Sequence, residues 1–430
     1  MKQITTLLCL VCLSAAISAQ SIQEISTGAG YQKQSYVNLS AGTEKQVSNT
    51  AWDIAFTVHG SQNAGVFINE SSGSSMGNPL PLIEVYDALT DNFNDQPDPA
   101  TITDFQLFNA EKSWDFGALN ERRNPEDALD LGWGVLDPQT GQVTGNAVYV
   151  LKLRNGQFRK IKVESLLNGQ YSFRYANLDG TNEVLKTINK ADHAGKTLAY
   201  FSLETGATVN VEPSSGGFDL FYGRYVSLLL APGTMEYIPY YVTGILAGNG
   251  AKVAEADGVE PVTVAYADYQ DSLRTELDVI GHDWKFFDLS AWSVDEDRVF
   301  FLKTANNRVW KLFFAGFEGS FTGVTVLEKT DLGIMSALND PPASGLECAI
   351  FPNPVQDQVT VSLDFPMAVA QNAKIQMVDL NGKVALHQAV FLKEGFQVFT
   401  LPANSLSPGL YHLQLELPEQ RISLGRMLKL

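Results

Sequence analysis

Residues 36–43 of the chain read YVNLSAGT, and residues 200–207 repeat the pattern as YFSLETGA. A short strand-like segment with Asp between apolar residues follows each one, WDIAF at 52–56 and FDLFY at 218–222. Later, YVLKLRNG at 149–156 is matched by FFLKTANN at 300–307. Three matches in the same order indicate that the region before about residue 335 is duplicated.

The duplicated region shows the period-two alternation of apolar and polar residues that is typical of strands. The Asn-Gly and Asn-Asn turns after its two late segments favour β-hairpins. A content of 35 Gly, 18 Pro and 10% aromatic residues also favours strands and turns. Only residues 268–277 and 124–131 suggest short helices. The sequence therefore predicts an all-β chain with two tandem β-domains, at residues 20–190 and 191–335.

A turn-rich stretch at residues 336–346 reads as a linker. Residues 347–430 follow with about seven short strands and regular turns, which predicts a small immunoglobulin-like β-sandwich. The residues that mark its entry, its turns and its end are Pro352, Asn353, Pro354, Asp379, Gly382, Gly409, Tyr411 and Lys429.

The N-terminus has the pattern of a signal peptide over residues 1–19, with an early Lys, an apolar stretch and small residues up to Ala19. No later run is long enough for a transmembrane helix. Of the three cysteines only Cys348 follows residue 19, so no internal disulfide is expected. A net charge of −18 opposes binding to nucleic acid.

The C-terminal elements, FPNP at 351–354, the turn at 379–383, the Leu406-x-x-Gly409-x-Tyr411 segment and the basic-apolar end, resemble the type IX secretion C-terminal sorting domain. The resemblance covers residues 347–430. It implies that the type IX secretion machinery is a partner. It also implies export through the periplasm and the outer membrane, to the cell surface or the medium.

The repeated Tyr-x-x-Leu-x-x-Gly opening, the 52–56 strand and the late hairpin resemble the HmuY-type haem-binding family, as two copies over residues 31–335. This resemblance implies β-rich domains and makes haem a candidate ligand, with another apolar small molecule as the alternative. A haem site needs axial ligands and an apolar slot. The candidate ligand-binding residues are His59, His193, His282, Met76 and Met235, and no family motif assigns a pair among them.

Catalytic patterns are weak. Residues 73–77, GSSMG, fit G-x-S-x-G but lack the strand before and the helix after that a nucleophile elbow needs. The acidic loop from Asp87 to Asp104 lacks EF-hand spacing, so calcium is not expected. We therefore predict an exported, non-enzymatic binding protein. The alternative is a structural or adhesive surface protein without a small-molecule ligand.

Overall fold

The computed structural model describes residues 20–61, 63–71, 82–213, 217–288, 290–334, 347–365, 370–379, 383–417 and 421–430. Within these residues the chain forms thirty strands and nine short 3₁₀ helices, which confirms the predicted all-β class. The 3₁₀ helices are η1 (Ala29–Tyr31), η2 (Pro99–Thr101), η3 (Thr103–Phe105), η4 (Ala118–Asn120), η5 (Lys190–His193), η6 (Tyr266–Asp268), η7 (Gln270–Ser272), η8 (Leu277–Val279) and η9 (Gly319–Phe321). The signal peptide, Met76, the linker and Gly382 lie outside the described residues.

The two predicted short helices are wrong. Near residues 268–277 only 3₁₀ turns form, because the backbone of Arg274 pairs in extended form with Val253. In residues 124–131 aspartate side chains bind the local backbone instead, with Asp130 accepting from Asn124 N at 2.9 Å.

The first unit, residues 54–209, has two sheets. The eight-stranded sheet runs β13-β12-β11-β10-β6-β7, with β9 paired to β11 and to β8. Its strands are β6 (Glu84–Asp87), β7 (Gln106–Leu107), β8 (Gly134–Leu136), β9 (Val143–Gly145), β10 (Tyr149–Lys152), β11 (Phe158–Leu167), β12 (Gln170–Ala176) and β13 (Val184–Asn189). The four-stranded sheet runs β15-β14-β4-β5 and contains β4 (Ile54–Thr57), β5 (Val66–Ile68), β14 (Leu198–Ser202) and β15 (Ala207–Val209).

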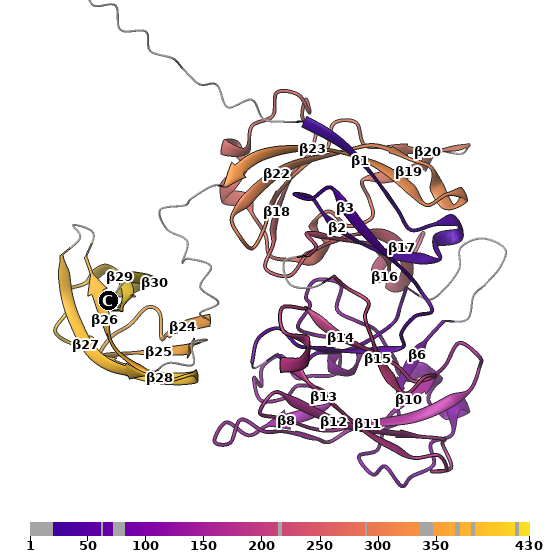
Figure 1. Cartoon of the computed structure of the whole chain (residues 1–430), viewed down its shortest axis with the longest axis horizontal. Helices are drawn as coiled ribbons and strands as arrows, with labels where there is room; N and C mark the ends of the chain where they lie inside the picture. The colour runs from indigo at the N-terminus through magenta and orange to yellow at the C-terminus, as the bar shows by residue number, and fades with distance from the viewer. Residues whose placement is uncertain are drawn as a thin grey trace, which may run out of the picture.

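The second unit, residues 20–48 and 220–334, has the matching sheets (Figure 1). The five-stranded sheet runs β1-β23-β22-β21-β18 and contains β1 (Gln20–Ser26), β18 (Lys252–Ala256), β21 (Val299–Lys303), β22 (Arg308–Phe317) and β23 (Val324–Ile334). The four-stranded sheet runs β17-β16-β2-β3 and contains β2 (Lys33–Asn38), β3 (Thr43–Ser48), β16 (Leu220–Leu230) and β17 (Tyr237–Ala247). A separate hairpin joins β19 (Lys285–Asp288) to β20 (Ala291–Val294).

The two units exchange their opening strands. In sequence order β1–β3 open the first copy, yet β1 pairs with β23 and β2 pairs with β16 of the second copy. In return β14, near the start of the second copy, pairs with β4 of the first. Strand pairing therefore crosses the boundary expected at residue 190, and each unit contains strands from both copies.

A repeated aspartate fixes this exchange. Asp53 Oδ2 accepts a hydrogen bond from Leu203 N at 2.6 Å, and Asp219 Oδ2 accepts one from Leu39 N at 2.8 Å. The backbone N–H of Asp53 also donates to Phe201, and that of Asp219 donates to Val37. The two motifs seen in the sequence thus bind each other across copies.

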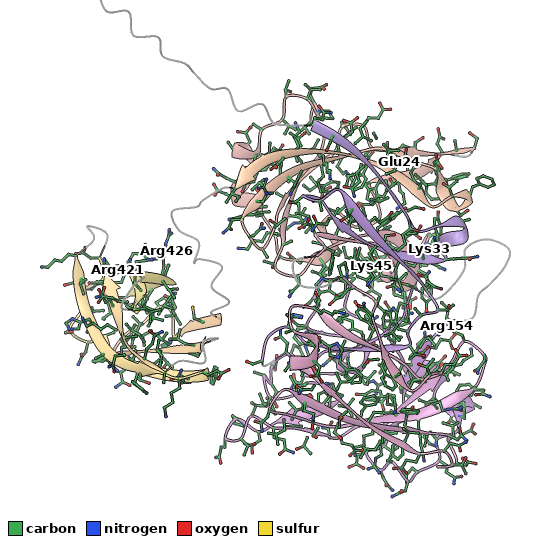
Figure 2. All side chains as sticks on the ribbon, viewed as in Figure 1. Glu24, Lys33, Lys45, Arg154, Arg421 and Arg426 are labelled. Atoms are coloured by element: carbon green, nitrogen blue, oxygen red, sulfur yellow. The ribbon has the colours of Figure 1, made fainter. Side chains whose placement is uncertain are left out.

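The junction between the units is a buried aromatic core. The hydroxyls of Tyr36 and Tyr200, which hold the same place in the two copies, lie 3.2 Å apart. Trp52 packs edge-on against Tyr200, with ring centroids 4.9 Å apart. Lys45, labelled in Figure 2, donates to the carbonyl of Glu212 at 3.1 Å. The two units therefore share a core.

The C-terminal domain has seven described strands in two sheets, as predicted for the sandwich. One sheet runs β24-β25-β28 and the other β27-β26-β29-β30. The strands are β24 (Glu347–Phe351), β25 (Gln358–Phe365), β26 (Gln371–Val378), β27 (Val384–Leu392), β28 (Gly395–Pro402), β29 (Gly409–Glu416) and β30 (Arg421–Lys429). Its apolar core, which includes Val361, Ile375, Leu413 and Met427, is its own.

Candidate functional site

His59 is held on both sides of its ring. Its Nε2 lies 2.9 Å from Asp115 Oδ1, and its Nδ1 lies 3.1 Å from the carbonyl of Thr197. The hydrogen bond from His59 lowers the pKa of Asp115. Because both ring nitrogens have partners and the side chain is only 16% exposed, His59 is not free to bind iron in this arrangement.

The other candidate ligands are dispersed. His193 ends η5 in the first unit, whereas His282 precedes β19 in the second, and burial lowers the pKa of both. Met235 is 96% exposed, in the turn between β16 and β17. The structure therefore does not bring these described candidates together as a pair of axial ligands. Within the described part of the chain, no group of three or more His, Cys, Asp or Glu could hold a metal ion.

An open groove of 1310 Å³ lies on the second unit and is here called the outer groove. Its floor is the face of the five-stranded sheet that points away from the main core, and its wall is the segment after β18. The floor residues are Phe301, Phe313, Ala315, Thr330, Leu332 and Ile334, and the wall includes Pro261, Val262, Val264 and Tyr266. Val262 is 84% exposed, so apolar surface lies open to solvent here.

The same sheet face is closed in the first unit. There the loop after β6 folds onto it, and Phe93 and Ile102 are 3% and 4% exposed against Val148 and Val150. Lys160 of β11 donates to the carbonyl of Asp95 at 2.9 Å and lies over the Phe93 ring. This loop is the acidic one noted in the sequence, and here it covers a small apolar core.

Lys311 of β22 is the counterpart of Lys160, because Lys311 pairs with Phe301 as Lys160 pairs with Val150. Its Nζ donates to the carbonyl of Val264 at 3.2 Å, and burial lowers its pKa. In each unit the lysine therefore links the sheet to the loop by a hydrogen bond to a loop carbonyl. In the second unit the loop also buries a small cluster, which contains Ala254, Ala256, Val299 and Phe301, and the outer groove lies beside this covered part of the face.

The charges of the outer groove nearly balance. Its described lining contains Lys303 and Lys311 with Glu260, Glu296 and Glu328, and it contains neither His nor Met. Histidine-ligated haem therefore does not fit the described residues of this groove. The lining has aromatic and aliphatic groups with a few polar ones, which is typical of sites for apolar small molecules.

Sequence reasoning missed this groove, although one signal was available. Aligning the two late hairpins sets Phe313 against Lys162, since Leu312 and Ile161 occupy the same register position. A charged residue on the outer face of the first unit is thus replaced by an aromatic one in the second. Such a change predicts extra apolar surface on that face.

The predicted sorting residues lie around the ends of the C-terminal strands. The side chain of Asn353, between Pro352 and Pro354, donates to Arg426 O at 3.1 Å and accepts from Leu428 N at 2.9 Å, so it holds β30. Asp379 Oδ1 accepts from Lys383 N at 3.0 Å and closes its turn. Tyr411, two residues after Gly409, donates to Ser407 O at 2.9 Å. Lys429 donates to the carbonyl of Leu430.

Comparison with known families confirms the resemblance of the C-terminal domain and that of the first of the two predicted HmuY-like copies. Residues 349–424 match the secretion system C-terminal sorting domain, and residues 30–175 match the HmuY protein family. The HmuY match covers the first copy as it runs along the chain. It therefore includes β2 and β3, which belong to the sheets of the second unit, and it ends one residue before the end of β12. Neither matched family is a family of enzymes.

No curated relative matches the chain. Among solved structures, dimeric latent PorU from Porphyromonas gingivalis aligns with 95% of this chain at 7% identity. The chain spans 34% of the length of that protein, and the TM-score of 0.18 supports no conclusion about fold or function. Within the described residues no helix is long and apolar enough to cross a membrane.

Proposed function

Starting from a chain that carries an HmuY domain and is exported by its type IX sorting domain, we propose a non-enzymatic binding protein whose outer groove takes up an apolar small molecule. The observation that carries this proposal is the difference between the two units. In the first unit the loop after β6 covers the outer sheet face, whereas in the second unit the loop covers only part of the equivalent face and a groove of 1310 Å³ remains beside it.

The ligand chemistry follows from the lining. Phe313 and Leu332 offer aromatic and aliphatic contact, while the charges of the two lysines and three glutamates of the lining nearly cancel. A neutral or weakly charged apolar molecule suits this surface better than a dianion. Haem, the ligand suggested by the family resemblance, would lack a histidine or methionine ligand there, so we do not assign it to the groove.

The experiment is a titration of the mature chain, residues 20–430, with the neutral dye Nile red. Ala315 is exposed on the groove floor, so Ala315→Trp places a bulky ring in the groove without changing the core. We expect dye affinity to fall at least tenfold in Ala315→Trp. Thr187→Trp, at an exposed position on β13 of the first unit, is the matched control and is expected to bind as the parent does. Equal affinity in all three proteins would contradict the proposal.

A haemin titration separates the alternative ligand. We expect no shift of the Soret band at micromolar protein. A shift that survives His193→Ala but disappears in His59→Ala or His282→Ala would replace the proposed ligand by histidine-ligated haem.

A further inference from the structure

The hairpin of β16 and β17 ends in an unusually apolar and exposed segment, here called the apolar tip (residues 228–240). The two strands pair out to Leu230 and Tyr237. The tip's most exposed large side chains are Leu228 (55%), Leu230 (53%), Met235 (96%), Tyr237 (65%) and Tyr240 (56%). Exposed apolar groups gathered on one element mark an interaction site rather than scattered surface residues.

Both faces of the tip are apolar. Directly paired residues share one face of a sheet, so Leu228 with Pro239 and Leu230 with Tyr237 form one face. Leu229 with Ile238 forms the opposite face, where Leu229 packs against the junction core and Ile238 is 38% exposed. A flat partner on the first face would leave Ile238 uncovered. Covering Ile238 as well requires a medium or a deep cavity that surrounds the end of the hairpin.

Charge is almost absent from this part of the chain. Residues 225–250 contain one charged residue, Glu236, in a protein whose charged content is 18%. Tyr240 is at the base of the tip, and Tyr241 follows it on the side of the body of the protein. Tyrosines in such a position are typical of side chains at a membrane interface, where the ring is in an apolar layer and the hydroxyl is in water.

The first unit has no such element among its described residues. Its equivalent hairpin, β4 and β5, has strands of four and three residues, and all seven are buried. The apolar tip is therefore an addition to the shared architecture rather than a requirement of it.

We propose that the apolar tip inserts into the acyl layer of a membrane at the cell exterior, where the sorting domain delivers the protein. Pro239 argues against a protein strand as the occupant, because it lies in β17, the edge strand of its sheet, and removes a backbone donor. Strand addition by another chain is thereby disfavoured. This proposal does not depend on the outer groove.

The test is flotation of the mature chain with vesicles of phosphatidylcholine, a lipid without net charge. We expect binding by the parent, with at least a tenfold loss in the double variant Leu230→Glu, Met235→Glu. Phe321→Glu, at a site that is 87% exposed on η9, is the matched control and keeps the parent's binding. An unchanged circular dichroism spectrum and an unchanged midpoint of urea unfolding show that each variant is folded.

Glu236 distinguishes lipid from a second copy of the chain as the occupant. Removing its charge in Glu236→Gln is expected to strengthen vesicle binding, and added salt is expected not to weaken it. The proposal is overturned if no vesicle binding occurs. It is also overturned if the parent is dimeric without lipid and Leu230→Glu, Met235→Glu makes it monomeric.

Discussion

At the scale of single residues, Asp53 and Asp219 show how a repeated motif can have unequal surroundings. Both accept the backbone N–H of a leucine from the other copy. Of the two, Asp53 also binds an arginine, Arg154, labelled in Figure 2, whose side chain is 16% exposed. Burial raises the pKa of Asp219, and the hydrogen bond from Leu39 N and the nearby Lys329 only partly offset this effect. The aspartate of the first copy therefore belongs to a largely buried ion pair.

These surroundings predict unequal losses of stability. Asp53→Ala leaves Arg154 without its carboxylate partner, and we expect the free energy of unfolding to fall by about 3–5 kcal/mol. Asp219→Ala removes a hydrogen bond to Leu39 N but no ion pair, and about 1–3 kcal/mol is expected. Urea unfolding of the mature chain measures both. Equal losses, or a larger loss for Asp219→Ala, would show that the Arg154 pair is not the dominant contact.

At the scale of strands, the exchange means that each copy contributes strands to sheets that the other copy largely forms. After a cut in the exposed turn between β12 and β13, β1 would still be paired with β23, and β2 with β16. The strand β14 would also still be paired with β4. The two fragments could separate only if all these pairings were broken. The buried aromatic junction would also be opened to water.

We therefore predict that a protease site inserted after Gly180 can be cleaved without releasing the halves. The two fragments should elute together in gel filtration at the mass of the uncut chain and separate only in denaturant. Two separate peaks in native buffer would mean that the exchanged strands do not hold the units together.

At the scale of the whole molecule, the sequence predicted the strands better than their partners. The repeats, the all-β class and the seven-stranded C-terminal domain could be read from local patterns. The exchange could not, because Tyr36 and Tyr200 lie in equivalent strands and neither local pattern shows which copy supplies the neighbouring strand. The groove was also missed, since Phe313 departs from its counterpart Lys162 only when the repeats are aligned by register.

The functional features also lie unevenly across the whole molecule. The first unit covers its outer sheet face and has a short hairpin of β4 and β5, whereas the second unit covers only part of that face and has a long, exposed hairpin of β16 and β17. We infer that the first unit supports the fold and the second makes contact with ligands.

The most direct test of this account is native mass spectrometry of the mature protein recovered from the producing cells. The account predicts a bound small molecule of a few hundred daltons, which is lost on denaturation and absent from Ala315→Trp but present in Thr187→Trp. A parent protein that carries no ligand, or a ligand that remains in Ala315→Trp, would contradict the assignment of the outer groove as the binding site.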